Sequence, residues 1–126
     1  MCGEPMSDRE IADKILKSIE KLYGSVPLVS KVMSERPDLF IPSSNFSKAL
    51  FEGEGRKIDR KTAYLCSVAA ASAVGGEYCI KVQGQHAIDA GATKDEILEA
   101  MTIGAYMAMT RAESIAFRKY KELFDE

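Results

Sequence analysis

The fold is decided by residues 61–96, KTAYLCSVAAASAVGGEYCIKVQGQHAIDAGATKDE, where two helical segments and the start of a third follow one another. The first segment is rich in alanine and begins after Asp59, a residue suited to cap a helix. Gly75-Gly76 breaks it, and a second helix is predicted from about Glu77 to Ala90. Thr93-Lys94-Asp95-Glu96 is a capping box, so a further helix is predicted to begin there.

The N-terminal part is also predicted to be helical. Ser7-Asp8-Arg9-Glu10 is a capping box, and apolar residues at helical spacing follow it as far as Gly24, which favours a left-handed helix end. A short second helix is predicted before the next proline. Pro37 and Pro42 are then predicted to bracket a break, with a short helix over residues 45–51 after it.

Towards the C-terminus, the helix that the Thr93 capping box opens is predicted to run through Met107. Thr110-Arg111-Ala112-Glu113 repeats the capping pattern and is predicted to restart a last helix, which ends near Phe124. No stretch shows sustained period-two alternation, so no sheet is predicted. The sequence therefore predicts an all-α protein.

The length favours a single domain. A chain of 126 residues has the size of one ordinary domain. The charged, glycine-containing stretch 52–57 separates N-terminal helices (7–51) from a core of about residues 57–124. We do not interpret this stretch as a domain linker, because the part before it is too small to bury its own core. One multi-helix bundle is predicted over residues 1–126.

The composition excludes several functional classes. A net charge of −2 provides no broad basic face, so nucleic acid is not an expected partner. His86 is the single histidine, which excludes sites built from two or three imidazoles of one chain. We accordingly expect neither a metal nor a cofactor.

The cysteines and the hydropathy point to a cytoplasmic protein. Cys2, Cys66 and Cys79 are odd in number and irregularly spaced, so reduced thiols are expected rather than a disulfide framework. The first residues lack the pattern of a signal peptide. The longest uncharged stretch, residues 62–76, has fifteen residues, fewer than the roughly 20 that a membrane span needs. We expect no membrane association.

Small residues dominate the predicted central helices, as at Ala69-Ala70-Ala71-Ser72-Ala73 and Gly104-Ala105. Small faces let helices approach closely, but they leave little volume to fill a core. A second subunit that supplies larger groups would compensate, so a homo-oligomer is expected.

Lys61-Thr62 at a helix start, the alanine-rich helix after it, Glu77-Tyr78-Cys79-Ile80 and the segment Ala90–Ile97 carry a family resemblance. Together they resemble the carboxymuconolactone decarboxylase-like family, which includes the alkylhydroperoxidase D-like proteins. The resemblance covers roughly the last two-thirds of the chain. It implies an all-α fold of the alkylhydroperoxidase D-like type and a homo-oligomer, commonly a trimer or hexamer.

The redox members of this family carry a Cys-x-x-Cys pair, a histidine four residues later and a glutamate fifteen residues before the second cysteine. Matched to this chain, the second cysteine is Cys79 and the first is replaced by Gly76. Gln83 stands at the histidine position and Tyr64 at the glutamate position. The decarboxylase branch also uses a histidine where Gln83 stands. Neither a second thiol nor a group titrating near neutral pH is therefore present at these positions.

The remaining reactive group is Cys79, in the first turn of its predicted helix, where the helix dipole and free N–H groups favour a thiolate. Gln83 lies one turn along and can touch it. His86 lies on the same side of the helix but about 10 Å further on, too far for a direct hydrogen bond. Alternative interpretations are an inert buried thiol for Cys79, a solvated or hydrogen-bonded His86, and a core aromatic for Tyr64.

The other two thiols are weaker candidates. Cys66 follows Tyr64 by two residues and is turned about 200° around the helix. If Tyr64 faces the site, Cys66 is expected to face away from it, into packing. Cys2, near the terminus, is a candidate external resolving thiol.

Three functional hypotheses follow. The first is a thiol-dependent, peroxidase-like oxidoreductase that uses Cys79 alone, takes a small-molecule substrate and depends on an external thiol reductant. Tyr64 and Gln83 would orient the substrate, with His86 at the rim. The second is a catalytically degenerate family member that acts as a small-molecule-binding or assembly module. The third is lactone chemistry of the decarboxylase branch, with His86 replacing the missing histidine.

Overall fold

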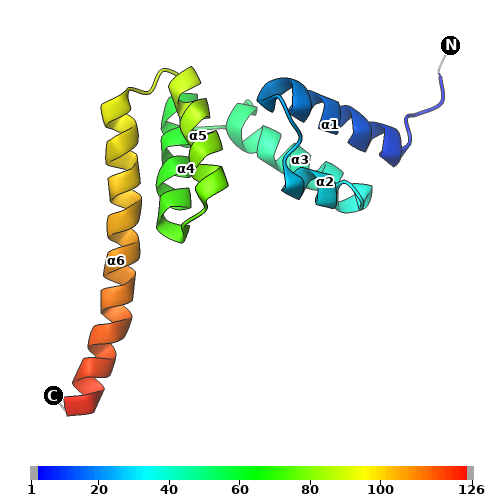
Figure 1. Cartoon of the computed structure of the whole chain (residues 1–126). Coiled ribbons are helices and arrows are strands. Elements are labelled where there is room, and N and C mark those ends of the chain that lie inside the picture. Colours follow the sequence, from blue (N-terminus) through cyan, green and yellow to red (C-terminus); the bar gives the residue numbers. More distant parts are fainter. Residues whose placement is uncertain (1–2, 125–126) are drawn as a thin grey trace. The chain divides into compact units, whose positions relative to one another are not determined.

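The computed structural model describes residues 3–124, and within them the chain forms six helices and no strand (Figure 1). These are α1 (Asp8–Tyr23), α2 (Leu28–Met33), α3 (Pro37–Glu52), α4 (Arg60–Val74), α5 (Glu77–Asp89) and α6 (Lys94–Phe124). The prediction of an all-α protein is confirmed. Over the same residues, no helix combines the length and the apolar character that a membrane crossing requires.

The chain divides into two compact units, residues 1–56 and residues 57–126. The first unit contains α1, α2 and α3, and the second contains α4, α5 and α6. The division falls in the charged loop that separates α3 from α4. The organisation of both units as one domain stays a prediction.

Helix α1 of the first unit begins and ends at the residues that the sequence indicates. The Oγ of Ser7 accepts a hydrogen bond from the backbone N–H of Glu10 at 3.2 Å, and Gly24 ends α1 with a φ of 79°. The Nη1 of Arg9 donates to the carbonyl of Ser34 at 2.8 Å, which links α1 to the end of α2. The predicted bounds of α1 are confirmed.

The predicted break between Pro37 and Pro42 is wrong, because α3 runs through both prolines. Pro37 lies at the start of the helix, where its fixed φ is suitable and its missing N–H has no intrahelical partner to lose. Pro42 lies inside the helix and removes one backbone hydrogen bond. The burial of Phe40, which is only 5% exposed, offsets that loss and favours a continuous helix.

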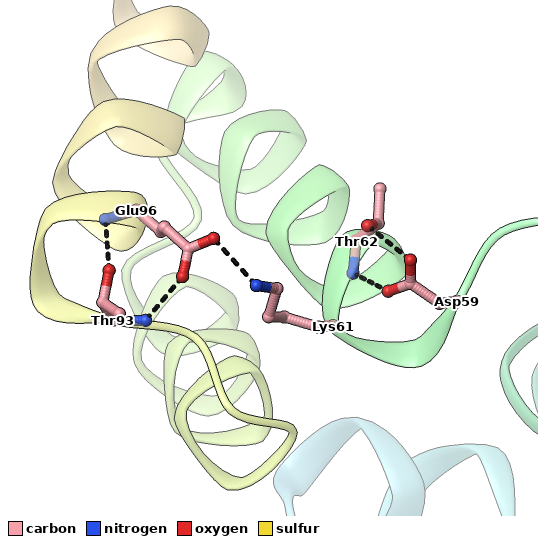
Figure 2. Close-up of polar contacts among 5 residues, drawn as sticks. All are labelled: Asp59, Lys61, Thr62, Thr93 and Glu96. Atoms are coloured by element: carbon pink, nitrogen blue, oxygen red, sulfur yellow. Dashed lines mark hydrogen bonds and ion pairs between the residues drawn. The ribbon is translucent and has the colours of Figure 1, made fainter.

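In the second unit, the predicted caps set where the helices begin. The Oδ1 of Asp59 accepts from the N–H of Thr62 at 2.8 Å at the start of α4 (Figure 2). Before α6, the N–H of Glu96 donates to the Oγ1 of Thr93 at 3.1 Å, and the N–H of Thr93 donates to the Oε1 of Glu96 at 2.9 Å. Gly75, with a φ of 75°, ends α4 as predicted.

The predicted restart of a helix at Thr110 is wrong, because α6 is one helix of 31 residues. The Oγ1 of Thr110 donates to the carbonyl of Met107 at 3.0 Å, so it bonds back into the same helix instead of capping a new one. No glycine or proline follows Gly104 within α6, so nothing in the backbone interrupts it.

Helix α4 is the centre of the second unit, since it packs against both α5 and α6. Near the start of α4 and α6, the Nζ of Lys61 forms an ion pair with Glu96 Oε2 at 2.9 Å. Further along, Gly104 of α6 lies directly against the backbone of Ala69 of α4. Both pairs are 35 residues apart in sequence, so α4 and α6 run parallel with a constant register.

The core of the second unit is built from small side chains. Val68 is its largest fully buried side chain, and the other buried apolar residues are mostly alanines, among them Ala71, Ala87 and Ala100. Small faces permit the close contact at Gly104, as the composition suggests. The homo-oligomer that we expect from this composition stays a prediction at this point.

Candidate functional site

Cys79 lies in the first turn of α5 and is exposed. Its position at a helix start is the predicted one, and the alternative of a buried thiol is wrong, whereas its reactivity stays a prediction. Gly76 caps this helix, and a Cβ added to Gly76 would lie 3.5 Å from the Cβ of Cys79 and 3.9 Å from its Sγ. The position that carries the partner cysteine in redox relatives is therefore directly beside the Cys79 sulfur.

Gln83 provides an unusual acceptor one turn further along α5. Its Oε1 is buried and has no hydrogen-bond partner among the described residues. An unsatisfied buried acceptor costs roughly 1–3 kcal/mol, so native proteins rarely keep one without a reason. The Gln83 Oε1 is therefore an acceptor whose donor the described residues do not supply.

Tyr64 of α4 and His86 of α5 stack on each other, with ring centroids 5.0 Å apart and an angle of 30° between the rings. Tyr64 is buried, at 8% exposure, so the alternative of a core aromatic describes it well. The guanidinium of Arg60 lies 6.0 Å from the centre of the Tyr64 ring, within the range of a cation–π contact. Tyr64 therefore contacts Arg60 of its own helix and His86 of α5.

These positions follow the border of the buried face of α5. Gly84 and Ala87 are buried at the centre of that face. At 100° per residue, Cys79, Gln83 and His86 fall within about 60° of arc beside it. Tyr64 reaches this border through its contact with His86, while Cys79 and His86 are about 10 Å apart along the helix axis.

Burial lowers the pKa of His86 below its ordinary value of about 6.5; Asp89 opposes this effect and Arg60 adds to it. We therefore expect the folded protein to titrate His86 at a lower pH than the unfolded chain. Just below pH 6.5, His86 then binds more protons in the unfolded chain than in the folded protein. The contribution of neutral His86 to the free energy of unfolding is therefore complete above about pH 6.5 and decreases as the pH falls below it. NMR titration of this single histidine, folded and in urea, measures both midpoints.

The charged neighbours provide controls for this titration. Arg60→Gln is expected to raise the His86 midpoint, because it removes a positive charge that lowers the pKa. Asp89→Asn is expected to lower the midpoint, because it removes a negative charge that raises the pKa. A folded midpoint at or above the unfolded one contradicts the burial that the structure assigns to His86.

Cys66 does not face into packing, as the sequence led us to expect, but is exposed on α4. A helix turns Cys66 away from Tyr64, and the side to which it turns is solvent rather than core. The predicted role of Cys2 as an external resolving thiol concerns a residue outside the described part of the chain.

The sequence reasoning predicted the caps at the start of α4 and α6 but missed the ion pair between Lys61 and Glu96 that joins them, which Figure 2 shows. There the carboxylate of Glu96 receives the backbone N–H of Thr93 and the ammonium of Lys61. The hydrogen bond from the Thr93 N–H has the larger effect, and together with the bond from Lys61 it holds the pKa of Glu96 below its usual value. Lys61 and Glu96 are both in the family motif, but only their meeting in space identifies them as a pair.

Metal-binding groups are not clustered in the described part of the chain. Over residues 3–124, no group of three or more histidine, cysteine, aspartate or glutamate side chains is placed to hold a metal ion. The site consists of a thiol, an amide acceptor and a pair of stacked rings.

The all-α fold and the cysteine at the start of α5 can be compared with known families. The model of the Carboxymuconolactone decarboxylase family matches residues 37–122, more than half of the chain. The chain therefore belongs to the carboxymuconolactone decarboxylase family, as its sequence resemblance indicated. Neither a curated protein nor a solved structure matches it.

Proposed function

We propose that this chain is a thiol-dependent oxidoreductase that reduces hydroperoxides with a single cysteine, Cys79. The observation that carries the proposal is the exposed position of this thiol in the first turn of α5. The exposure gives a peroxide access to the sulfur.

The chemistry begins with attack of the Cys79 thiolate on the hydroxyl oxygen of a hydroperoxide. An S–O bond forms and the O–O bond breaks, so the sulfur is oxidised to a sulfenic acid. The alkoxide leaving group takes a proton from water and departs as an alcohol, the reduced product.

Return to the thiol requires an external reductant, because Gly76 occupies the place of a resolving cysteine. One small thiol condenses with the sulfenic acid, which releases water and forms a mixed disulfide. A second thiol attacks this disulfide, leaves as the oxidised reductant and restores the Cys79 thiol. The reduced thiols of a cytoplasm are a suitable source of both.

Gln83 supports the proposal as a positioning residue. Its buried Oε1 lacks a donor, and the O–H of a hydroperoxide is a donor of the required kind. Such a bond would hold the hydroxyl oxygen of the hydroperoxide at Gln83, which is one helical turn from the attacking thiolate of Cys79. Tyr64 and His86, stacked at the α4–α5 seam, would limit the substrate on its far side.

The test is Cys79→Ser, assayed by hydroperoxide consumption with an external thiol present. We expect the rate to fall by about two orders of magnitude or more, to that of the buffer, because serine cannot form a sulfenic acid. Cys66→Ser is the matched control, since it makes the same change at another exposed cysteine and is expected to keep the wild-type rate. A wild type that consumes no hydroperoxide, or a Cys79→Ser variant as active as the wild type, rejects the proposal.

A second candidate function is a small-molecule-binding module without turnover. It is favoured by the unsatisfied Gln83 Oε1, which would accept a hydrogen bond from a bound ligand whether or not Cys79 reacts. The rate of Cys79 alkylation at neutral pH separates the two candidates. A rate above that of free cysteine favours the oxidoreductase, and an equal or lower rate favours the binding module.

A further inference from the structure

Once Cys79 is oxidised to a sulfenic acid, its fate depends on which groups can reach the sulfur. Two reactions within a chain protect a sulfenic acid from further oxidation. A second thiol can form a disulfide with it, or the backbone nitrogen of the next residue can form a cyclic sulfenamide. Each reaction requires its partner group directly beside the sulfur.

No second thiol lies beside Cys79 in the described part of the chain. Gly76 occupies a place beside the sulfur, where an added Cβ would lie 3.9 Å from the Cys79 Sγ. The other described thiol, Cys66, belongs to α4 and is exposed. Tyr64 contacts His86 of α5, and Cys66 is turned about 200° from Tyr64, so Cys66 lies on the side of α4 away from α5. A helix about 10 Å thick then separates Cys66 from Cys79, whereas a disulfide requires Cα atoms within about 7 Å.

The next backbone nitrogen is held within the helix. A sulfenamide forms when this nitrogen attacks the sulfur and loses its hydrogen. The nitrogen belongs to Ile80, and its N–H donates to the carbonyl of Gly76 at 2.8 Å, a bond of the first turn of α5. Attack on the Cys79 sulfur would break this bond and open the start of the helix. The structure therefore favours neither of the two protective reactions.

The exposed Cys79 side chain is accessible to molecules from outside the chain. An external thiol condenses with the sulfenic acid, and a second thiol then returns the cysteine to its thiol form. A second hydroperoxide has a different effect: the sulfur attacks its hydroxyl oxygen, a second S–O bond forms and the O–O bond breaks. The alkoxide takes the proton of the sulfenic acid and departs as an alcohol. The sulfur is left as a sulfinic acid, which thiols do not reduce.

We infer that Cys79 is a peroxide-sensitive switch, which excess hydroperoxide turns off by oxidation to the sulfinic acid. The inference rests on the proposed function, in which the same hydroperoxide is the substrate. The external thiol and the second hydroperoxide compete for one sulfenic acid, so the ratio of their concentrations decides how many turnovers precede inactivation. Gly76 sets this sensitivity, because a thiol at that position would remove the sulfenic acid before a second hydroperoxide meets it.

The first test counts the turnovers that the wild type completes before its activity is lost, with an external thiol and a hydroperoxide present. A tenfold higher hydroperoxide concentration is expected to lower this number about tenfold, and a doubled thiol concentration is expected to double it. The inactive protein is expected to carry two added oxygen atoms, about 32 Da, on Cys79. Cys66→Ser is the control, and it is expected to give the wild-type number because Cys66 lies on the far side of α4.

The second test changes the residue beside the sulfur. Gly76→Cys is expected to raise the number of turnovers before inactivation about tenfold or more, because the introduced thiol reacts with the sulfenic acid within the chain. Gly76→Ser adds a side chain of nearly the same size without a thiol, and it is expected to keep the wild-type number. Equal numbers for these two variants overturn the inference.

The outcomes for the wild type separate this inference from the proposed function. A wild type that consumes hydroperoxide, but whose number of turnovers does not depend on the hydroperoxide concentration, overturns the inference and leaves the proposed function intact. The same holds for a wild type that ends with Cys79 in a disulfide within the chain. A wild type that consumes no hydroperoxide overturns both.

Discussion

Replacement of Gly104 with alanine is expected to lower the free energy of unfolding by about 2 kcal/mol or more. A Cβ at this position would overlap the carbonyl of Ala69, and a backbone group cannot move aside by a change of rotamer. The α4 and α6 helices would have to separate, which opens the core around Val68. Alanine favours a helix over glycine by about 1 kcal/mol, but this gain is smaller than the loss of packing.

Gly84 is the matched control, because it is also a buried glycine inside a helix. A Cβ added to Gly84 meets nothing within 4 Å, so only the gain in helix propensity remains. Gly84→Ala is therefore expected to raise the free energy of unfolding by roughly 0.5–1 kcal/mol. Chemical denaturation of both variants measures the two changes, and effects of the same sign would contradict the close contact between α4 and α6.

The second large effect is expected from Gly76→Cys, which adds a thiol beside Cys79. The Cβ separation of 3.5 Å lies within the range that a disulfide requires. Gly76 has a φ of −80°, which other residues adopt without strain. Mild oxidation is therefore expected to join the introduced thiol to Cys79 in a disulfide and to remove two of the four thiols of the variant from titration.

Gly76→Cys is also expected to change the reaction that follows peroxide attack. The new thiol can resolve the Cys79 sulfenic acid within the chain, so trapping of that sulfenic acid by a 1,3-dicarbonyl reagent should fall about tenfold or more. Gly75→Cys is the control, because a Cβ there meets nothing within 4 Å and the φ of 75° is unfavourable for cysteine. Four free thiols in oxidised Gly76→Cys would exclude the predicted geometry.

The helix starts could be predicted because their signals are local. Ser7, Asp59 and Thr93 each accept a hydrogen bond from a backbone N–H three residues later, and such a bond depends on only a few neighbouring residues. The two errors, at Pro42 and Thr110, are places where a local signal competes with a longer helix. At Pro42 the burial of neighbouring Phe40 outweighs the lost hydrogen bond, and a single sequence does not give the burial of a side chain.

The candidate site divides in the same way. The position of Cys79 at a helix start follows from Gly75-Gly76 before it, so the sequence is sufficient. The stack of Tyr64 on His86 joins residues of two helices, and it depends on how α4 and α5 pack. The unsatisfied Oε1 of Gln83 requires knowledge of every atom around it, which spacing along one helix does not provide.

Because α6 is uninterrupted, a rotation of the helix about its contact at Gly104 would move its whole C-terminal part. The helix is about 46 Å long, and the 20 residues from Gly104 to Phe124 form a rigid arm of about 30 Å. A tilt of about 5° at the contact with Ala69 would displace the tip of this arm by roughly 2.5 Å. Small adjustments in the packing of two small residues are thereby converted into movements as large as a side chain at the far end of the molecule's longest helix.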